Sequence, residues 1–206
     1  MTTRPAYRIK TKRLIIRCYN PDDAPLLEAS VIESVEHLKP WMPWAQSENE
    51  ETLQSRIERL RSFRGKFDLN QDFIYGIFNL DQTRLLGGTG LHTRLGNDVL
   101  EIGYWIHKDF INQGLATETA SALTKVGFEV HEISRMEIHC DPSNVRSAAV
   151  PRKLGYSLEA ILKKRSRFIE DWRDSSIWTL FQEDFPKSPA QLIEIKAFDA
   201  ANRQLI

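Results

Sequence analysis

The spacing of apolar and polar residues along the chain predicts alternating strands and helices. Short β-branched and apolar stretches, typical of strands, occur at 14–19, 73–78, 85–91, 99–107, 135–140, 157–163 and 175–182. Apolar residues at helical spacing predict helices over 21–34, 47–63, 114–130 and 144–154. This order of strand, two helices, three strands, helix, strand, helix and two strands predicts an α/β fold.

Local signals set several element boundaries. Ser47 and Glu50 have the spacing of a capping box at the start of the second helix. Pro40 and Pro43 predict an irregular segment over 35–46. Gly155 stands where a glycine commonly ends a helix. Alternation along 99–107 places Glu101 and Trp105 on one face of their strand, so these two side chains are expected to lie together.

Composition indicates one folded domain with a short appendage. The 206 residues are 41% hydrophobic and 27% charged, which excludes a disordered chain and a membrane-embedded one. We expect a single domain over 1–186 and a helical tail over 187–206, because Leu192, Ile195 and Phe198 recur at helical spacing. The tail is expected to pack on the domain or on another subunit, so both a monomer and a homodimer remain open.

Charge and cysteine content narrow the partners and the compartment. Lys plus Arg and Asp plus Glu each number 28, so the formal net charge is zero and a direct nucleic-acid partner is not expected. Cys18 and Cys140 lack metal-site or disulfide-framework spacing and are read as reduced thiols, and no metal is expected. No stretch resembles a membrane helix or a signal peptide, so we expect a cytoplasmic protein with no membrane partner.

Two stretches carry candidate chemistry. Residues 104–118 run from strand through loop and glycine into a helix, and a helix start offers free N–H groups to a phosphate. Gly114 would let the backbone approach such a ligand, although a glycine there also serves simple packing. In the second stretch, Asn144 and Ser147 are three residues apart on one helix face. Ordinary helix capping explains this second pattern equally well.

Five segments together resemble a known family. They are LIIRCYNPDDA at 14–24, LKPWMPW at 38–44, LEIGYWI at 100–106, NQGLATETA at 112–120 and HCDPSNVRSAAVPRKLGY at 139–156. Over residues 11–183 the chain resembles the GNAT superfamily of acyl-CoA-dependent N-acyltransferases, and more closely its RimJ/RimL-like branch of ribosomal-protein N-terminal acetyltransferases. The resemblance implies a mixed, mostly antiparallel sheet with a splayed central pair of strands, flanked by helices on both faces.

The resemblance also implies acetyl-CoA (coenzyme A) as cofactor. The family's pyrophosphate loop, Q/R-x-x-G-x-G/A, falls on residues 111–116, where Gly114 and Ala116 match. Ile111 replaces the polar first position and Asn112 stands where glycine is common, which implies weaker contacts rather than a lost site. The implied cofactor-binding residues are Trp105, Ile106, His107, Asn112, Gln113, Gly114, Leu115, Ala116, Thr117, Asn144 and Ser147.

The mechanism implied by the resemblance is direct attack of a neutral amine on the thioester, which needs a base and a donor to the departing thiolate. Glu101 is the first candidate base; the alternative is that it is a solvated carboxylate on the strand. His139 is the second candidate, with a hydrogen-bonded structural role as the alternative, and Glu137 is a weaker third. Ser147 is the candidate donor to the thiolate.

Aromatic residues are candidates for the acceptor pocket. Trp41, Trp44, Tyr75 and His92 are expected to line it, although for Tyr75 a place in the core is favoured. A basic run, Lys163, Lys164, Arg165 and Arg167, is typical of a solvated hairpin end, with docking to an acidic partner or rRNA as the alternative.

We therefore expect acetyl transfer to the N-terminal α-amine of a protein or peptide, possible substrates including a ribosomal protein. One alternative is acetylation of a small-molecule amine such as a polyamine, a sugar amine or an antibiotic. The other is a weakly catalytic acyl-CoA-binding or ribosome-associated module, suggested by the departures at Ile111 and Asn112.

Overall fold

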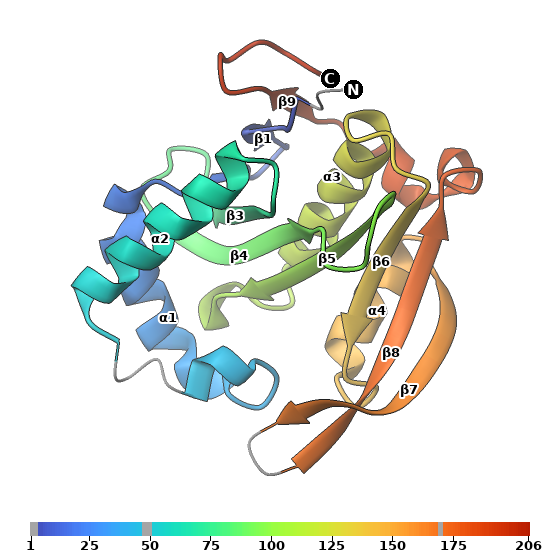
Figure 1. The fold of residues 1–206 in the computed structure, drawn as a ribbon, viewed down its shortest axis with the longest axis horizontal. Helices are drawn as coiled ribbons and strands as arrows, with labels where there is room; N and C mark the ends of the chain where they lie inside the picture. The colour runs from blue at the N-terminus through green and yellow to red at the C-terminus, as the bar shows by residue number, and fades with distance from the viewer. Residues whose placement is uncertain (1–3, 47–50, 169–170) are drawn as a thin grey trace.

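A computed structural model describes residues 4–46, 51–168 and 171–206. These residues form a nine-stranded sheet in the order β7-β8-β6-β5-β4-β3-β2-β1-β9 (Figure 1). The strands are β1 (Arg8–Lys10), β2 (Ile15–Cys18), β3 (Phe73–Phe78), β4 (Leu85–His92), β5 (Val99–Ile106), β6 (Arg135–Cys140), β7 (Ser157–Phe168), β8 (Asp171–Phe181) and β9 (Lys196–Phe198). The α-helices are α1 (Ala24–Leu38), α2 (Leu53–Asp68), α3 (Leu115–Glu129) and α4 (Val145–Lys153). Helices α1 and α2 cover one face of the sheet, and α3 and α4 cover the other (Figure 1).

The centre of the sheet opens between β5 and β6. This is the one parallel pair among the described strands, and all the other neighbours are antiparallel. Pairing runs from Val99 opposite Arg135 to Glu101 opposite Glu137 and then stops, although both strands continue. The backbone groups of β5 beyond Glu101 therefore lack a strand partner on the β6 side. The expected mixed sheet with a splayed central pair is confirmed.

The first helix is longer than expected. Helix α1 runs to Leu38 rather than Ser34, because Leu27, Val31, Val35 and Leu38 continue the buried stripe. Pro40 follows two residues later, so the irregular segment is shortened to 39–46 and contains a 3₁₀-helix, Pro43–Gln46. The proposed capping box at Ser47 and Glu50 lies outside the described residues. The N-cap of α2 is Thr52, whose hydroxyl accepts the Ser55 N–H at 3.1 Å.

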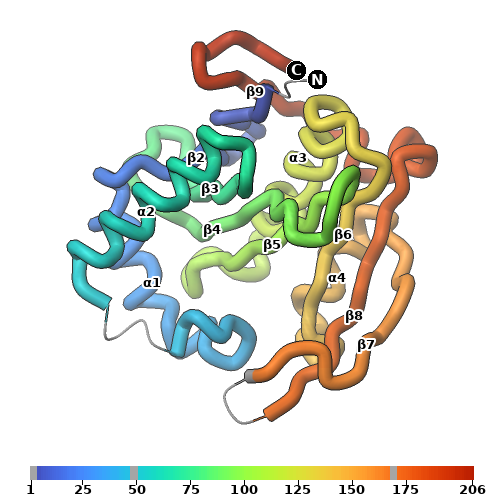
Figure 2. The backbone as a smooth tube through the Cα atoms, viewed as in Figure 1, coloured from blue at the N-terminus to red at the C-terminus, as the bar shows by residue number. Residues whose placement is uncertain are grey.

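The prediction of a helical tail is wrong. After a 3₁₀-helix, Pro189–Leu192, the chain forms β9, which pairs antiparallel with β1. Leu192, expected on the apolar stripe, is 78% exposed, whereas Ala197 is fully buried opposite Ile9. Strand β1, which the apolar pattern did not predict, leaves an open edge of the sheet, and β9 satisfies its backbone groups. Both ends of the chain therefore lie at the same end of the molecule (Figure 2).

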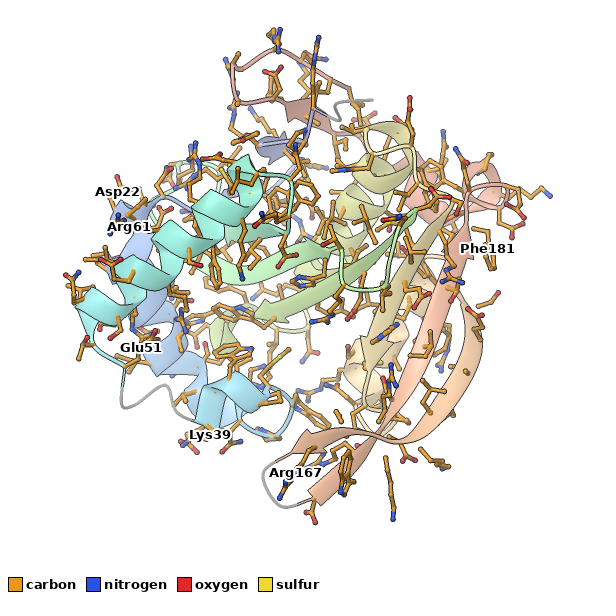
Figure 3. All side chains as sticks on the ribbon, in the orientation of Figure 1. Asp22, Lys39, Glu51, Arg61, Arg167 and Phe181 are labelled. Atoms are coloured by element: carbon orange, nitrogen blue, oxygen red, sulfur yellow. The ribbon has the colours of Figure 1, made fainter. Side chains whose placement is uncertain are left out.

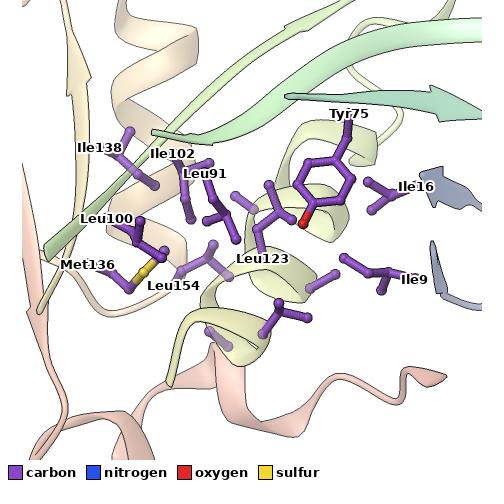
Figure 4. Packing of buried hydrophobic residues seen from close by; sticks show 14 of the residues in the cluster. Ile9, Ile16, Tyr75, Leu91, Leu100, Ile102, Leu123, Met136, Ile138 and Leu154 are labelled. Carbon is purple, nitrogen blue, oxygen red and sulfur yellow. The ribbon is translucent and has the colours of Figure 1, made fainter. Parts of the chain in front are cut away.

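The main hydrophobic core lies between the sheet and helices α3 and α4. Figure 4 shows Leu91 and Ile102 from the sheet, with Leu123 of α3 and Leu154 just after α4. Tyr75 lies in this core with its ring fully buried. A second cluster lies under α1 and α2 and contains Ile15, Tyr19, Leu27, Val31 and Leu60. Burial of this apolar surface is the main favourable term in folding.

Cys18 and Cys140 are free cysteines, and burial raises the pKa of both thiols. Among the helices of the described residues, none has the length and apolar character needed to cross a bilayer.

Candidate active site

Two cavities meet at the opening between β5 and β6. Cavity A, of about 540 Å³, lies between helices α1 and α2 and the facing side of β4, β5 and β6. Cavity B, of about 470 Å³, lies between the end of α1, the loop before α3, and α4. Six residues line both cavities: Trp41, Met42, Tyr104, Trp105, Asn144 and Ser147. The two cavities therefore meet where the sheet is unpaired, and one ligand can reach from B into A.

The start of α3 supplies backbone donors to cavity B. Gly114 has a φ of +79°, in the left-handed region that favours glycine, and directly precedes the helix. The first helical hydrogen bond is from the Glu118 N–H to the Gly114 carbonyl, at 3.0 Å. The N–H groups of residues 115–117 are thus left without helical acceptors in a wall of cavity B. Free N–H groups and the positive end of the helix dipole fit a pyrophosphate.

The loop before α3 keeps the required shape in spite of its unusual sequence. Asn112, which stands where the family commonly has glycine, has a φ of +59°, and asparagine tolerates this conformation better than most residues. Arg13 fixes the loop from the outside: its Nη1 donates to the Gln113 carbonyl at 2.9 Å and its Nε to Glu118 at 2.6 Å. The departure at Asn112 therefore preserves the backbone geometry.

Ser147 is fixed at the junction of the cavities by two neighbours, Asn144 and Tyr104. The Asn144 side chain caps α4 by accepting the Ser147 N–H at 3.1 Å. Pro151 has no N–H to bond the Ser147 carbonyl four residues earlier, and the Tyr104 hydroxyl donates to that carbonyl at 3.1 Å instead. The Tyr104 oxygen also lies 3.2 Å from Ser147 Oγ. Because burial raises the pKa of Tyr104, its hydroxyl stays protonated and remains a donor at neutral pH.

Sequence reasoning missed Tyr104. Alternation placed it on the core face of its strand, and it becomes a site residue because the strands separate beside it. The feature of the sequence that could have indicated a role for Tyr104 is Pro151. Because proline has no N–H, the carbonyl of Ser147, four residues earlier, is left without its helical donor.

In cavity A, His139 lies between two carboxylates. Its Nε2 is 2.6 Å from Glu137 Oε2, and its Nδ1 is 3.8 Å from Glu101 Oε2. Each carboxylate also has an arginine partner: Arg135 Nε lies 3.0 Å from Glu137, and Arg94 forms a two-pronged pair with Glu101. The three residues proposed as candidate bases thus form one cluster on adjacent strands.

The environment of Glu101 makes it a weak base. Burial alone would raise the pKa of this carboxyl group, which is only 4% exposed. The hydrogen bonds and charge of Arg94, together with the charge of His139, outweigh burial and hold the pKa below its ordinary value. Glu101 is therefore ionised at neutral pH, and both of its carboxylate oxygens already accept hydrogen bonds from Arg94.

The structure brings most of the proposed site residues together. Cavity A is lined by Glu101, His139, Trp44 and His92; cavity B by Ile106, Asn112, Gly114, Leu115, Ala116 and Thr117; and both by Trp41, Trp105, Asn144 and Ser147. The Trp44 and Trp105 rings meet edge to face, with centroids 6.0 Å apart. His92 is oriented by Asp72, whose Oδ1 lies 2.9 Å from Nδ1.

Three proposed residues are placed differently from the others. Tyr75 lines cavity A, but its side chain is fully buried and its ring packs on Phe67, in agreement with the place in the core that the sequence favoured. Gln113 lines neither cavity, and its side chain donates to the Asp109 carbonyl at 3.0 Å. His107 also lines neither cavity, because it follows the last residue of β5 and its ring turns toward α1.

His107 belongs to the one group among the described residues whose ligand atoms are close enough to hold a metal. In this group Glu33, His107 and Asp109 have ligand atoms within 4.8 Å of one another. Both ring nitrogens of His107 already have partners: Nε2 lies 3.1 Å from Glu33, and Nδ1 accepts the Asp109 N–H at 3.2 Å. The group is explained as a contact between β5 and α1.

The basic run lies on the β7–β8 hairpin. Lys163 pairs with Asp174 at 2.9 Å, and the run continues toward the end of the hairpin, where Figure 3 labels Arg167. Docking of an acidic partner or rRNA to this surface stays a prediction.

Comparison with known proteins agrees with the geometry of the cavities. The family model described as an acetyltransferase (GNAT) domain matches residues 13–157. Among curated proteins, the chain is 28% identical over 105 residues to the N-acetyltransferase YnaD of Bacillus subtilis, a match that covers 51% of this chain and 62% of that protein. It is 25% identical over 185 residues to the [ribosomal protein uS5]-alanine N-acetyltransferase of Escherichia coli, covering 88% of this chain and 94% of that enzyme.

A solved structure has the same fold. RimJ of Mycobacterium smegmatis, in complex with CoA-disulfide, aligns with a TM-score of 0.82 at 21% identity and covers 93% of this chain and 95% of that chain. At this identity the match concerns the fold.

Proposed function

This chain belongs to the GNAT acetyltransferase family, whose acyl donor is acetyl-CoA, and we propose that it acetylates the N-terminal α-amine of a protein or peptide. The observation that carries the proposal is the junction of cavities A and B beside the unpaired β5 edge, where Ser147 lines both cavities and His139 lines cavity A. The ribosomal-protein alanine acetyltransferase of Escherichia coli, similar over most of its length, supports this choice of acceptor.

Cavity B would hold the acyl donor. The N–H groups of residues 115–117 would bind the pyrophosphate, and the unpaired edge of β5 would bind the pantetheine amides. When bound, acetyl-CoA supplies an acetyl thioester whose C–S bond breaks as the acceptor nitrogen forms the new C–N bond.

His139 is the base that the geometry favours. His139 lines cavity A, and with Nε2–H donating to Glu137 at 2.6 Å, Nδ1 is the ring nitrogen left to accept a proton. It accepts a proton from the acceptor ammonium group, and Glu101, 3.8 Å away, stabilises the resulting imidazolium charge. Glu101 itself is less suited to this step, because its pKa lies below the ordinary value and Arg94 occupies both of its oxygens.

Ser147 is the residue whose hydroxyl would donate a hydrogen bond to the sulfur of the leaving thiolate. Its position is fixed by the Asn144 cap and by Tyr104, so its hydroxyl is pre-positioned to donate a hydrogen bond at the junction. The Tyr104 hydroxyl oxygen lies 3.2 Å from Ser147 Oγ while its O–H donates to the Ser147 carbonyl, so Tyr104 helps to hold Ser147 in this position.

An α-amine is the acceptor that this base can best serve. An α-amino group has a pKa of about 7.7–8.0, against about 10.4 for a lysine amine, so a sizeable fraction is already neutral near pH 7.5. A general base at this site therefore has little deprotonation to complete.

The test compares acceptors at equal concentration. With acetyl-CoA as donor, a short peptide with a free Ala or Ser N-terminus should show a kcat/KM at least about tenfold above that of spermidine or glucosamine. A preference for the small amines would overturn the proposal and favour a small-molecule acetyltransferase.

A further inference from the structure

The Tyr19 side chain lies at the floor of cavity A, where it packs against two glycines of the sheet. A Cβ on Gly76 would lie 2.8 Å from the Tyr19 ring, and a Cβ on Gly88 would lie 3.2 Å from its hydroxyl oxygen. The ring thus runs from β3 to β4 flat against the sheet, which any side chain at these two positions would prevent. Tyr19 is only 3% exposed, yet it lines cavity A.

A second donor meets the Tyr19 hydroxyl above Gly88. The same Cβ position on Gly88 lies 2.5 Å from Trp105 Nε1, so the indole nitrogen and the Tyr19 hydroxyl oxygen both lie beside Gly88 at the cavity floor. Among the described residues, no side chain or backbone group forms a hydrogen bond with either atom. Burial raises the pKa of Tyr19, so its hydroxyl remains protonated. Two neutral donors in the lining of a cavity, with no protein acceptor among the described residues, are available to an acceptor oxygen of a bound ligand.

The charges around this point are already neutralised. Arg59, which also lines cavity A, pairs with Glu51 at 3.0 Å. Arg17 pairs with Asp23 at 2.7 Å. The positive charge of each of these two arginines is therefore balanced by a carboxylate, so neither favours an anionic ligand group such as a carboxylate or phosphate. The oxygen of an uncharged group is the better match for the two neutral donors.

We propose that Tyr19 Oη and Trp105 Nε1 bind a carbonyl oxygen of the acceptor, and so select an amine attached to an aminoacyl chain. The inference rests on the proposed function and deepens it, because it explains how a peptide would be distinguished from an amine on a hydrocarbon chain. Trp105 belongs to both the donor cavity and the acceptor cavity. Its side chain lines cavities A and B, and its backbone pairs with Gly88.

The position of the donor pair fits the first two residues of a peptide. If the register in which Glu101 faces Glu137 is continued by two residues, His139 comes level with Gly103. Strand residues rise about 3.4 Å each, so Trp105 lies about 7 Å further along β5. An amine placed beside His139 would thus have a carbonyl of its first or second residue over Gly88.

The test is the kinetics of Tyr19→Phe with two matched acceptors. One is a tripeptide amide with a free N-terminus, and the other is the analogue in which the first two carbonyl groups are reduced to CH₂. Loss of one buried hydrogen bond should raise KM for the tripeptide about 5- to 10-fold with kcat changed less than about twofold. KM for the reduced analogue should stay within about twofold of wild type, because it has no carbonyl to lose.

Tyr156→Phe is the matched control. It also removes a buried hydroxyl, which bonds to Thr124 at 2.7 Å in the core, and it should leave both KM values unchanged. Equal KM values for the tripeptide in wild type and Tyr19→Phe, or equal increases for both acceptors, would overturn the inference while leaving the proposed function intact. Failure of the wild-type protein to acetylate the tripeptide would instead overturn the proposed function and the inference with it.

Discussion

His139 and its neighbours decide the chemistry at the scale of single residues. Alternation along the strands correctly predicts that Glu101 and Trp105 share a face, and all three candidate bases occur where the pattern placed them. The sequence could not rank them, because the ranking depends on cross-strand contacts. Arg94 reaches Glu101 from a loop, while Glu137 leaves His139 one free nitrogen.

Replacing the proposed base should remove turnover and leave donor binding intact. We expect His139→Gln to lower kcat by about 10²- to 10⁴-fold, the usual contribution of a general base. The dissociation constant of acetyl-CoA, measured by calorimetry, should change less than about twofold, because His139 lines cavity A alone. If kcat were retained in His139→Gln and lost in Glu101→Gln, the assignment of the base would be reversed.

His131 provides a prediction on stability. Burial lowers its pKa to about 4, while its ring packs on Phe73 at a centroid distance of 4.7 Å. Between about pH 6.5 and 4 the unfolded chain binds the proton and the folded protein does not, so stability is lost as pH falls through this window. The free energy of unfolding should fall by up to about 3 kcal/mol from this residue.

His131→Phe is the comparison for this prediction. It keeps a ring against Phe73 and removes the titrating group. Urea unfolding at pH 7, 6 and 5 should give a shallower loss of stability in the variant than in the wild type. Parallel curves for the two proteins would show that His131 does not contribute.

At the scale of elements, the strands and helices that are best predicted from the sequence are those in the middle of the fold, which pack against neighbouring elements on both sides. The hairpin of β3 and β4, strand β5 and helix α3 lie within a residue or two of their expected bounds, because each has a strong apolar period. Three-residue strands carry too little pattern to be recognised, which explains why β1 was missed. The same limit explains the tail, where three apolar residues at helical spacing belong to a turn and an edge strand.

The start of α3 is the element on which donor binding depends. Gly114→Trp should abolish acetyl-CoA binding, because its φ of +79° disfavours any side chain and an indole would fill the wall of cavity B. Calorimetric titration of the folded variant measures this directly. Gly65→Trp is the control: a Cβ there, on α2, meets nothing within 4 Å, and binding should be retained. Normal binding by Gly114→Trp would show that the phosphate site lies elsewhere.

The edge strand β9 should contribute stability without contributing to activity. Ala197 is fully buried opposite Ile9, and β9 lines neither cavity. Ala197→Arg should therefore lower the free energy of unfolding by about 2–4 kcal/mol, since it buries an unpaired charge. Below its unfolding transition the variant should keep the wild-type kcat/KM. The exposed neighbour Lys196, changed to Ala, should shift stability by less than about 0.5 kcal/mol.

For the whole molecule, one architectural feature makes the site. Helices α1 and α2 close one face of the sheet and α3 and α4 the other, so a gap between two central strands joins the cavities on the two faces (Figure 1). The resemblance in sequence predicts this gap. Of the six residues that the two cavities share, Trp41, Trp105, Asn144 and Ser147 were predicted as site residues. Met42 and Tyr104 were not, because their place at the junction depends on where β5 and β6 separate.

The gap between β5 and β6 is proposed to carry acetyl transfer to an N-terminal α-amine. A direct test is the mass gained from acetyl-CoA by short peptides with free Ser, Ala, Thr or Met N-termini, beside N-blocked peptides that carry a lysine. We expect one added acetyl group, located by fragmentation at the N-terminal nitrogen, on the free peptides alone. Acetylation of the blocked lysine peptides, or of no peptide by a protein that binds acetyl-CoA, would refute the proposed function.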